Sequence, residues 1–279
     1  MVDYKAIKNI PQEELIRILR FISEQKSIDL CSYRQNFCFR HIRSRMQETG
    51  CLTASDYIRY IKENKEELDH FIDSLSINVT HFFRDKEVFE AFAKNALVEL
   101  IQKKDSVADR GVIRVWSAAC ATGQEPYSLA ILLTEALQKK PNFLIKILAT
   151  DVDNDALEAA QKGFYEERDF REMDKKLLEK YFEPVYNGKY SVHPQIRNLV
   201  KFERHNLITD PPFKHMDIIF CRNVMIYFSR QQQDELIKKF YEGLNSGGFL
   251  VLAKVEMVWN KDLFKIYDLN NKIYQKINQ

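Results

Sequence analysis

A stretch of small residues between an apolar run and a helical pattern has the composition of a ligand-binding loop. It reads SAACATGQEPYSLA from Ser117 to Ala130, and open α/β sheets bind ligands at such strand-to-helix junctions. Small side chains there let a ligand approach the backbone closely. Because the loop has one glycine, Gly123, in place of G-x-G-x-x-G, and no Walker lysine, it suits a pyrophosphate poorly. Glu125 near the helix start favours a cation instead, so a sulfonium cofactor with a free ammonium group fits better than an anion.

An acidic residue ends the next apolar run, in the segment LATDVD. In dinucleotide-binding folds an acid at the end of the second strand accepts hydrogen bonds from both ribose hydroxyls, and Asp151 is the candidate here. The alternative is that Asp151 only caps a helix that begins near Asn154. Taken alone, this acid and the small-residue loop indicate a nucleoside-binding α/β domain and nothing narrower.

The elements that must position these residues alternate between strands and helices. Apolar runs are found at Val112–Trp116, Leu144–Ala149, Leu199–Phe202, Asp217–Phe220 and Phe249–Leu252, and helical patterns at Pro126–Gln138, Ala156–Gln161 and Gln231–Leu244. This alternation predicts a parallel sheet covered on both faces. The last stretch, FKIYDLNNKIYQKI, predicts a terminal antiparallel hairpin around Asn270–Asn271.

The α/β alternation is interrupted between about residues 164 and 205. We expect an inserted antiparallel subdomain there, in which Tyr190–Val192 and Leu199–Phe202 are the candidate strands. Asn187–Gly188 has the residue types of a hairpin turn.

The N-terminal part has helical patterns and no strand pattern. Three of the apolar stripes are Leu15, Ile18, Leu19 and Ile22 after Pro11; Phe39, Ile42 and Met46 before Gly50; and Tyr57, Ile58 and Ile61 after a cap at Thr53 or Ser55. From Asp85 a longer helix should place Val88, Phe89, Phe92, Ala96 and Leu100 on one face. We therefore expect an all-α domain over residues 1–80, followed by an α/β domain over residues 81–279.

The composition agrees with a globular protein and argues against several other classes. The 279 residues are 45% hydrophobic and carry a net charge of +2, so the chain is not strongly basic. Its five cysteines form no CxxC pair, which argues against zinc and disulfide frameworks. The N-terminus MVDYKAIKNI lacks the apolar core of a signal peptide, and no run of 18 apolar residues occurs. We expect a cytoplasmic protein with no metal and no membrane insertion.

Four segments together resemble a known family more specifically. SINVTHFFRD, SAACATGQEPYSLA, FCRNVMIYF and GGFLVLAKVE are similar to segments of the chemotaxis receptor glutamate methyltransferase family, CheR, with LATDVD, GFY and HNL between them in the family's order. The resemblance covers essentially the whole chain. It implies a Rossmann-like, S-adenosylmethionine-dependent methyltransferase sheet with a small β-subdomain insertion, preceded by an all-α domain. It also implies methyl esterification of glutamates on bacterial chemoreceptors, with S-adenosylhomocysteine as product.

The resemblance also assigns roles to individual residues. Arg84 and Tyr227 would be catalytic, and the cofactor-binding residues would be Asn78, Thr80, Arg84, Glu125, Asp151, Asn206, Leu207, Arg222 and Asn223. A glutamate side chain is ionised at neutral pH, with a reference pKa of about 4.3, so the reaction needs no general base. What it needs is alignment of a carboxylate oxygen with the sulfonium methyl group. Arg84 can hold that carboxylate through paired hydrogen bonds.

Ordinary structural roles compete with these assignments. Arg84 and Asp85 are also the residue types of an ordinary helix-start ion pair, and such surface pairs are common and weak. Tyr227 and Phe228 are also the residue types of a core after a buried strand. Cys221 is interpreted as a small buried residue, not a nucleophile.

A basic surface is expected in the helical domain. No acidic residue occurs between Asp29 and Glu48, whereas Arg34, Arg40, Arg43 and Arg45 all do. We expect these four arginines to face solvent and bind the acidic methylation region of a receptor, as the resemblance also implies, although His41 stands where the family usually has arginine. The competing interpretation is a solvated charged face. The hairpin near Asn187 looks too short to bind a receptor C-terminal peptide, so we expect no such tether, and we expect a monomer at receptor arrays.

Two other functions are consistent with parts of the sequence. Asp210-Pro211-Pro212-Phe213 matches the catalytic motif of nucleic-acid amino-methyltransferases, but it precedes the fourth strand, whereas that motif should follow it. A base-flipping enzyme should also have a broader basic channel, so no nucleic-acid partner is expected. The second alternative is a non-catalytic, cofactor-binding scaffold, which would have no need to retain both Arg84 and Tyr227.

Overall fold

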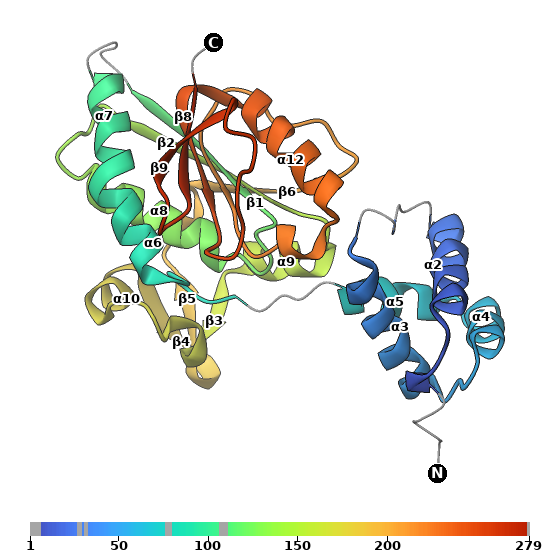
Figure 1. Cartoon of the computed structure of the whole chain (residues 1–279). Coiled ribbons are helices and arrows are strands. Elements are labelled where there is room, and N and C mark those ends of the chain that lie inside the picture. Colours follow the sequence, from blue (N-terminus) through green and yellow to red (C-terminus); the bar gives the residue numbers. More distant parts are fainter. Residues whose placement is uncertain (1–6, 27–29, 31–32, 76–79, 106–110, 278–279) are drawn as a thin grey trace. The chain divides into compact units, whose positions relative to one another are not determined.

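Two units make up the chain, and Figure 1 draws both. The structure is a computed structural model that describes residues 7–26, 30, 33–75, 80–105 and 111–277. The helical unit comprises Met1–Ile77 together with Tyr227–Gln232, and the α/β unit comprises Asn78–Ile226 and Gln233–Gln279. The sequence patterns did not indicate that a six-residue segment so late in the chain belongs with the helices.

Amphipathic helices build the helical unit around one core. They are α2 (Gln12–Lys26), α3 (Gln35–Thr49), α4 (Ala54–Glu63) and α5 (Glu66–Leu75). The predicted stripes are buried, including Ile18 on α2 and Ile42 on α3. Of the two candidate caps, Thr53 is the one used, because its side chain accepts a hydrogen bond from the backbone N–H of Asp56. Gly50 ends α3 in the left-handed conformation, with φ of 72°.

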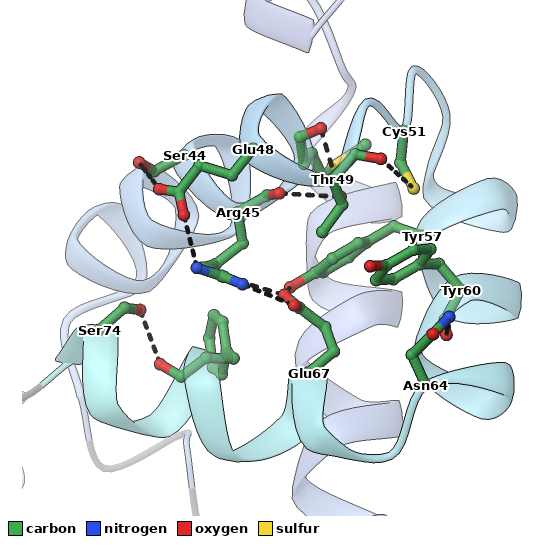
Figure 2. Close-up of polar contacts among 12 residues, drawn as sticks. Ser44, Arg45, Glu48, Thr49, Cys51, Tyr57, Tyr60, Asn64, Glu67 and Ser74 are labelled. Atoms are coloured by element: carbon green, nitrogen blue, oxygen red, sulfur yellow. Dashed lines mark hydrogen bonds and ion pairs between the residues drawn. The ribbon is translucent and has the colours of Figure 1, made fainter.

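A buried ionic network joins three of these helices (Figure 2). Glu67 on α5 is 3% exposed and accepts two hydrogen bonds from Arg45 on α3, to Oε1 at 2.9 Å and to Oε2 at 2.6 Å. The hydroxyl of Tyr57 on α4 donates to the same carboxylate at 2.8 Å. Burial raises the pKa of Tyr57 well above its usual value, so this phenol stays a donor.

The network corrects one expectation about the basic surface. Arg34 and Arg40 are exposed and Arg43 is half-buried, but Arg45 does not face solvent. Arg45 lies three residues after Ile42 and one before Met46, at the edge of the buried stripe of α3. Its guanidinium therefore reaches Glu67 and stabilises the helical unit.

We expect Glu67→Gln to destabilise the helical unit by about 2–4 kcal/mol, since it removes the buried carboxylate from Arg45 and leaves this cation paired only with the more exposed Glu48 among the contacts described. The matched control is Glu14→Gln on α2, which removes an exposed pair with Arg17 and should change stability by less than about 0.5 kcal/mol. Urea denaturation followed by far-UV circular dichroism measures both. Equal midpoints for the two variants would contradict this account of the network.

A seven-stranded sheet forms the centre of the α/β unit, in the order β6-β2-β1-β7-β8-β10-β9. The strands are β1 (Val112–Ala118), β2 (Leu144–Asp151), β6 (Val200–Arg204), β7 (Met216–Cys221), β8 (Leu244–Leu252), β9 (Phe264–Asp268) and β10 (Ile273–Lys276). The first five are mutually parallel, and β10 runs antiparallel to β8 and β9. The predicted parallel sheet and terminal hairpin are confirmed. Strand order reverses between β1 and β7, the switch point at which such sheets bind ligands.

Helices cover both faces of this sheet (Figure 1). They are α6 (Lys86–Ala91), the π-helical turn η2 (Phe92–Ala96), α7 (Leu97–Asp105), α8 (Gln124–Ala136), α9 (Asn154–Lys162) and α12 (Arg230–Gly243). Trp116 of β1 contacts Phe240 of α12, with ring centroids 5.5 Å apart. Phe220 of β7 contacts Phe92, at 5.3 Å. Phe220 pairs with Ser117, the residue after Trp116, so these two aromatics lie on opposite faces of the sheet.

The π-helical turn explains how the predicted apolar face stays buried. Residues spaced by four drift by about 40° per step around a regular α-helix, because four residues rotate by about 400°. At η2 the backbone N–H of Leu97 bonds to the carbonyl of Phe92, five residues earlier. This wider turn takes up one extra residue, and both Ala96 and Leu100 after Phe92 are buried.

The inserted subdomain differs from expectation in one of its strands. Its elements are β3 (Phe164–Glu166), η3 (Glu167–Phe170), α10 (Lys175–Tyr181), β4 (Phe182–Val185), η4 (Tyr186–Gly188), β5 (Lys189–Val192) and α11 (Pro194–Arg197), with strand order β3-β5-β4. The placement of Leu199–Phe202 in this small sheet is wrong, because β6 pairs in parallel with β2 in the large sheet. Its residues Val200 and Phe202 pack on the Cys120–Ala149–Leu157 cluster there. The turn at Asn187–Gly188 is confirmed, with positive φ at both residues.

Candidate functional site

The small-residue loop leaves β1 through a series of left-handed residues. Ala119 has φ of 62°, Ala121 of 47° and Gly123 of 94°. An L-residue in this conformation costs about 1–2 kcal/mol, so the surrounding structure has to hold the two alanines. It does so from β2: the N–H of Cys120 bonds to the carbonyl of Thr150 at 2.9 Å, and the N–H of Ala121 to Oδ2 of Asp151 at 2.8 Å.

Gly123, which begins α8, has a packing role. A Cβ at this position would lie 2.8 Å from Cβ of Ala160 and 2.9 Å from the hydroxyl of Tyr165. That hydroxyl donates to the carbonyl of Thr122 at 2.8 Å, on the same loop. The absence of a side chain at Gly123 therefore allows α9 and the inserted subdomain to approach the loop.

Asp151 ends β2 with its carboxylate directed at the loop. Besides the bond from Ala121, Oδ1 accepts the N–H of Asp153 at 3.1 Å. The helix-capping alternative is wrong, because Asp153 is the residue that caps α9 through the N–H of Ala156. Burial raises the pKa of Asp151. A carboxylate has about four lone-pair sites, so Asp151 keeps the capacity to accept a hydrogen bond from a ribose hydroxyl.

Glu125 and Arg222 form the charged centre at the switch point. Oε1 of Glu125 accepts the hydroxyl of Ser117 at 2.8 Å, and Oε2 lies 3.7 Å from Nη1 of Arg222. Arg222 follows β7, is 2% exposed and also pairs through Nη2 with Asp85. Burial raises the pKa of Glu125, and the charge of Arg222 opposes this effect. Two carboxylates, those of Glu125 and Asp85, share the one buried guanidinium of Arg222. Asp151 ends the adjacent strand β2, and this excess of acids fits a positively charged cofactor group.

One buried nitrogen of Arg222 is available to donate a hydrogen bond to a ligand. Its guanidinium lies 5.5 Å from the ring centroid of Phe89, and its Nε has no hydrogen-bond partner in the described part of the chain. Asn223, the next residue, has a φ of 61° and is half-buried. Asp85, considered above as an ion-pair partner of Arg84, pairs with Arg222 in the structure.

Glu256 is a site residue that the sequence reasoning missed. It is buried after β8, where Oε1 accepts the N–H of Met225 and Oε2 the N–H of Ala253, both at 2.9 Å. Burial raises the pKa of Glu256, whereas its backbone hydrogen bonds and the charge of Arg222 lower it. This acid thus ties the loop after β7 to the end of β8. The only signal for it was its place in the segment GGFLVLAKVE.

A turn at residues 81–85 presents Arg84. Phe83 and Asp85, on either side of Arg84, both have positive φ, at 54° and 57°. The N–H of Phe82 bonds to the carbonyl of Asp169, and the N–H of Phe83 to the hydroxyl of Ser128. The turn is therefore fixed by the inserted subdomain on one side and by α8 on the other. The charge of Arg84 is close enough to lower the pKa of Glu125.

The side chain of His81 strengthens this attachment. Its Nε2 lies 2.7 Å from Oε1 of Glu172, and its Nδ1 lies 2.6 Å from Nη2 of Arg171. Thr80, just before the turn, is half-buried. Asn78 lies outside the described residues.

The predicted adenine-side residues lie in a turn after β6. Oδ1 of Asn206 accepts the N–H of Ile208, and the N–H of Asn206 donates to Oδ2 of Asp210, both at 2.9 Å. Leu207 is buried, and Nζ of Lys239 donates to the carbonyls of Leu207, Ile208 and Asp210. Asp210, the acid of the Asp-Pro-Pro-Phe motif, is therefore part of a structural turn ahead of β7.

Tyr227, at the end of the 3₁₀ turn η5 (Met225–Tyr227), belongs to the helical unit. Its ring contacts that of Phe37, with centroids 4.6 Å apart, and its carbonyl accepts the N–H of Arg34 at 2.8 Å. The predicted site residues are thus divided: Glu125, Asp151, Arg222 and Arg84 lie in the α/β unit, and Tyr227 lies in the helical unit.

Other candidate chemistries find little support in the described residues. No group of three or more His, Cys, Asp or Glu side chains there could hold a metal ion. The cysteines at positions 38, 51, 120 and 221 are free and buried, and burial raises the pKa of the Cys120 and Cys221 thiols. Within the described residues, no helix is both long enough and apolar enough to cross a membrane.

Comparison with known proteins was informative over both units. Residues 78–273 match the family model described as CheR methyltransferase, SAM binding domain, and residues 13–76 match CheR methyltransferase, all-alpha domain. The chain is 33% identical to the chemotaxis protein methyltransferase of Listeria monocytogenes, over 95% of this chain and 98% of that protein. It is also 33% identical to that of Escherichia coli K12, over 86% and 82%. An uncharacterized 104.1 kDa protein of Rhodobacter capsulatus is 32% identical over 96% of this chain, which spans only 28% of that protein.

Proposed function

Since the chain belongs to the CheR methyltransferase family and is an S-adenosylmethionine-dependent methyltransferase of chemotaxis, we propose that it esterifies glutamate side chains of bacterial chemoreceptors. The observation that carries this proposal is the charged centre at the switch point, where buried Glu125 faces a single buried arginine and Asp151 ends the neighbouring strand. Such a site accepts a nucleoside that carries positive charge more readily than a phosphate.

The residues of this site would divide the cofactor between them. Asp151 would accept the ribose hydroxyls, Glu125 would bind the ammonium group, and Asn206 and Leu207 would lie along the adenine. Asn78, Thr80, Arg84, Arg222 and Asn223 complete the proposed set. When bound, the cofactor supplies an electrophilic methyl group, and S-adenosylhomocysteine is the product.

The chain's own task would be to orient the acceptor. The glutamate is ionised at neutral pH, so no residue has to remove a proton. We propose that the forked guanidinium of Arg84 holds the carboxylate and that the hydroxyl of Tyr227 aligns one oxygen for in-line attack. Strong binding of the ground state would not raise the rate, so orientation matters more than affinity.

We expect Asp151→Asn to weaken S-adenosylhomocysteine binding by about 10- to 100-fold, as expected for a lost charge-assisted hydrogen bond worth about 1.5–3 kcal/mol. Asp153→Asn is the matched control, two residues away, because asparagine caps a helix as well as aspartate does. Isothermal titration calorimetry measures both affinities. If the two variants bind alike, Asp151 does not hold the ribose.

We propose that three arginines of the helical unit, Arg34, Arg40 and Arg43, bind the glutamate-rich helices of the receptor. We also propose that the protein is a monomer and acts at receptor arrays in the cytoplasm. Arg45 is left out of this set, since it is paired with Glu67 and Glu48. Tyr186, 93% exposed, lies in the three-residue turn between β4 and β5. So short a loop supports the proposal that no receptor C-terminal peptide is bound there, and truncating that peptide should leave the rate unchanged.

The function is tested by incubating the protein with tritiated S-adenosylmethionine and receptor-rich membranes. Base-labile label on the receptor is the expected result, since methyl esters hydrolyse in base. Label that appears only on added DNA would favour a nucleic-acid methyltransferase. Binding of cofactor without any labelled product would favour a non-catalytic scaffold.

A further inference from the structure

The ring of Phe37 connects several groups in the helical unit. It lies in the first turn of α3, is 8% exposed, and contacts the ring of Tyr227 at 4.6 Å between centroids and the imidazole of His41 at 4.5 Å. The guanidinium of Arg40 lies 5.6 Å from the same ring centroid. One side chain therefore touches both the proposed catalytic tyrosine and a proposed receptor-binding arginine.

The backbone of Tyr227 and Phe228 is held by Arg34, the residue that precedes α3. The N–H of Arg34 donates to the carbonyl of Tyr227 at 2.8 Å, and its Nε donates to the carbonyl of Phe228 at 3.2 Å. Tyr33 and Phe228 form an isolated antiparallel bridge, and their rings meet edge to face at 5.4 Å. These bonds hold the main chain of Tyr227 and Phe228, and the contact with Phe37 is one of those that orient the Tyr227 ring.

We propose that Phe37 is a positioning residue for methyl transfer, which holds the Tyr227 ring in the orientation that the reaction requires. The inference rests on the function proposed above. Aromatic rings in contact restrict each other's orientation, because the charge distribution of each ring makes the interaction depend on angle. The Tyr227 ring lies at 37° to that of Phe37. An aliphatic side chain would fill space without imposing this angle. Because a misplacement of about 1 Å can lower a rate by about 100-fold, loss of the ring should act on turnover.

The test compares Phe37→Leu with Phe39→Leu, a control on the same helix whose ring is buried in the same core. We expect Phe37→Leu to lower kcat for receptor methylation by about 10- to 100-fold, with the KM for S-adenosylmethionine unchanged. Phe39→Leu should keep kcat within about twofold when assayed well below its melting temperature, because it removes core volume and leaves the Phe37–Tyr227 ring contact in place. Phe37→Met, which is unbranched and fills irregular space, repeats the test if the leucine variant does not fold.

A double-mutant cycle separates positioning from general destabilisation. If Phe37 acts through Tyr227, then Phe37→Leu should lower kcat further by less than about twofold in a Tyr227→Phe background, because residues that act as a unit are not additive. A full additional drop in that background, or an unchanged kcat in the single variant, overturns the inference. Failure of the unaltered chain to methylate receptors would instead overturn the proposed function.

Discussion

Replacing Arg84 with alanine should lower kcat/KM for receptor methylation by about 10²–10³, the range seen when one preorganised donor is removed from an active site. The expected loss is large because the backbone that carries Arg84 is held in a strained turn. Both residues beside Arg84 have positive φ, and the turn is bonded to the inserted subdomain and to α8. Arg84→Lys should recover only part of the loss, since an ammonium group lacks the planar fork.

Lys86→Ala is the matched control for Arg84. It removes a basic side chain two residues further on, whose partner is the exposed Glu90, and it should leave kcat/KM within about twofold because such pairs contribute little. Rates with tritiated cofactor and purified receptor give both values. Full activity of Arg84→Ala would show that another group holds the acceptor carboxylate.

Arg222→Met should be the most destabilising single change at the site, by about 3–5 kcal/mol. Methionine fills part of the space over Phe89 but leaves Glu125 and Asp85 without their shared cation. The variant should also lose cofactor binding, because the charge of Arg222 favours the ionised form of Glu256, which holds the loop after β7. Chemical denaturation and calorimetry with S-adenosylhomocysteine measure the two effects. Arg204→Met, an exposed arginine at the end of β6, is the control and should resemble the unaltered chain.

The loss caused by Arg222→Met should depend on pH in a definite direction. The pKa of Glu125 is raised by burial and held down by Arg222. Removing the arginine therefore raises the pKa of Glu125 further. An acid with a raised pKa in the folded state contributes stability below its unfolded pKa and loses it as pH rises through the folded value. The stability difference between variant and unaltered chain should be smaller at pH 5 than at pH 8, and a constant difference would exclude Glu125 as the cause.

Local patterns predicted where the proposed cofactor-binding residues lie, because these residues are placed by the elements next to them. Asp151 and Glu125 stand directly beside a strand end and a helix start, so the parallel sheet alone brings them to one edge. The same holds for Arg222 after β7. Their hydrogen bonds to Ala121 and Ser117 were not predictable, since these depend on the left-handed turns of the loop.

What the sequence could not supply were pairings between distant residues. Arg45 looks like its exposed neighbours until Glu67, 22 residues later, is placed beside it. Leu199–Phe202 has the same apolar pattern whether it joins the small sheet or the large one, and only the parallel partner β2 decides between them. Tyr227 meets Phe37 across 190 residues of sequence, a contact that no periodicity encodes.

The π-helical turn between α6 and α7 has a consequence for how this chain tolerates a deletion. Elsewhere in a regular helix, loss of one residue rotates everything after it by about 100°. At Phe92–Ala96 the backbone already accommodates one residue more than an α-helix needs. Removing the exposed Lys94 or the exposed Asn95 should convert this turn into ordinary α-helix and leave Leu97 and Leu100 facing the sheet. The segment thus contains a residue that the fold can do without.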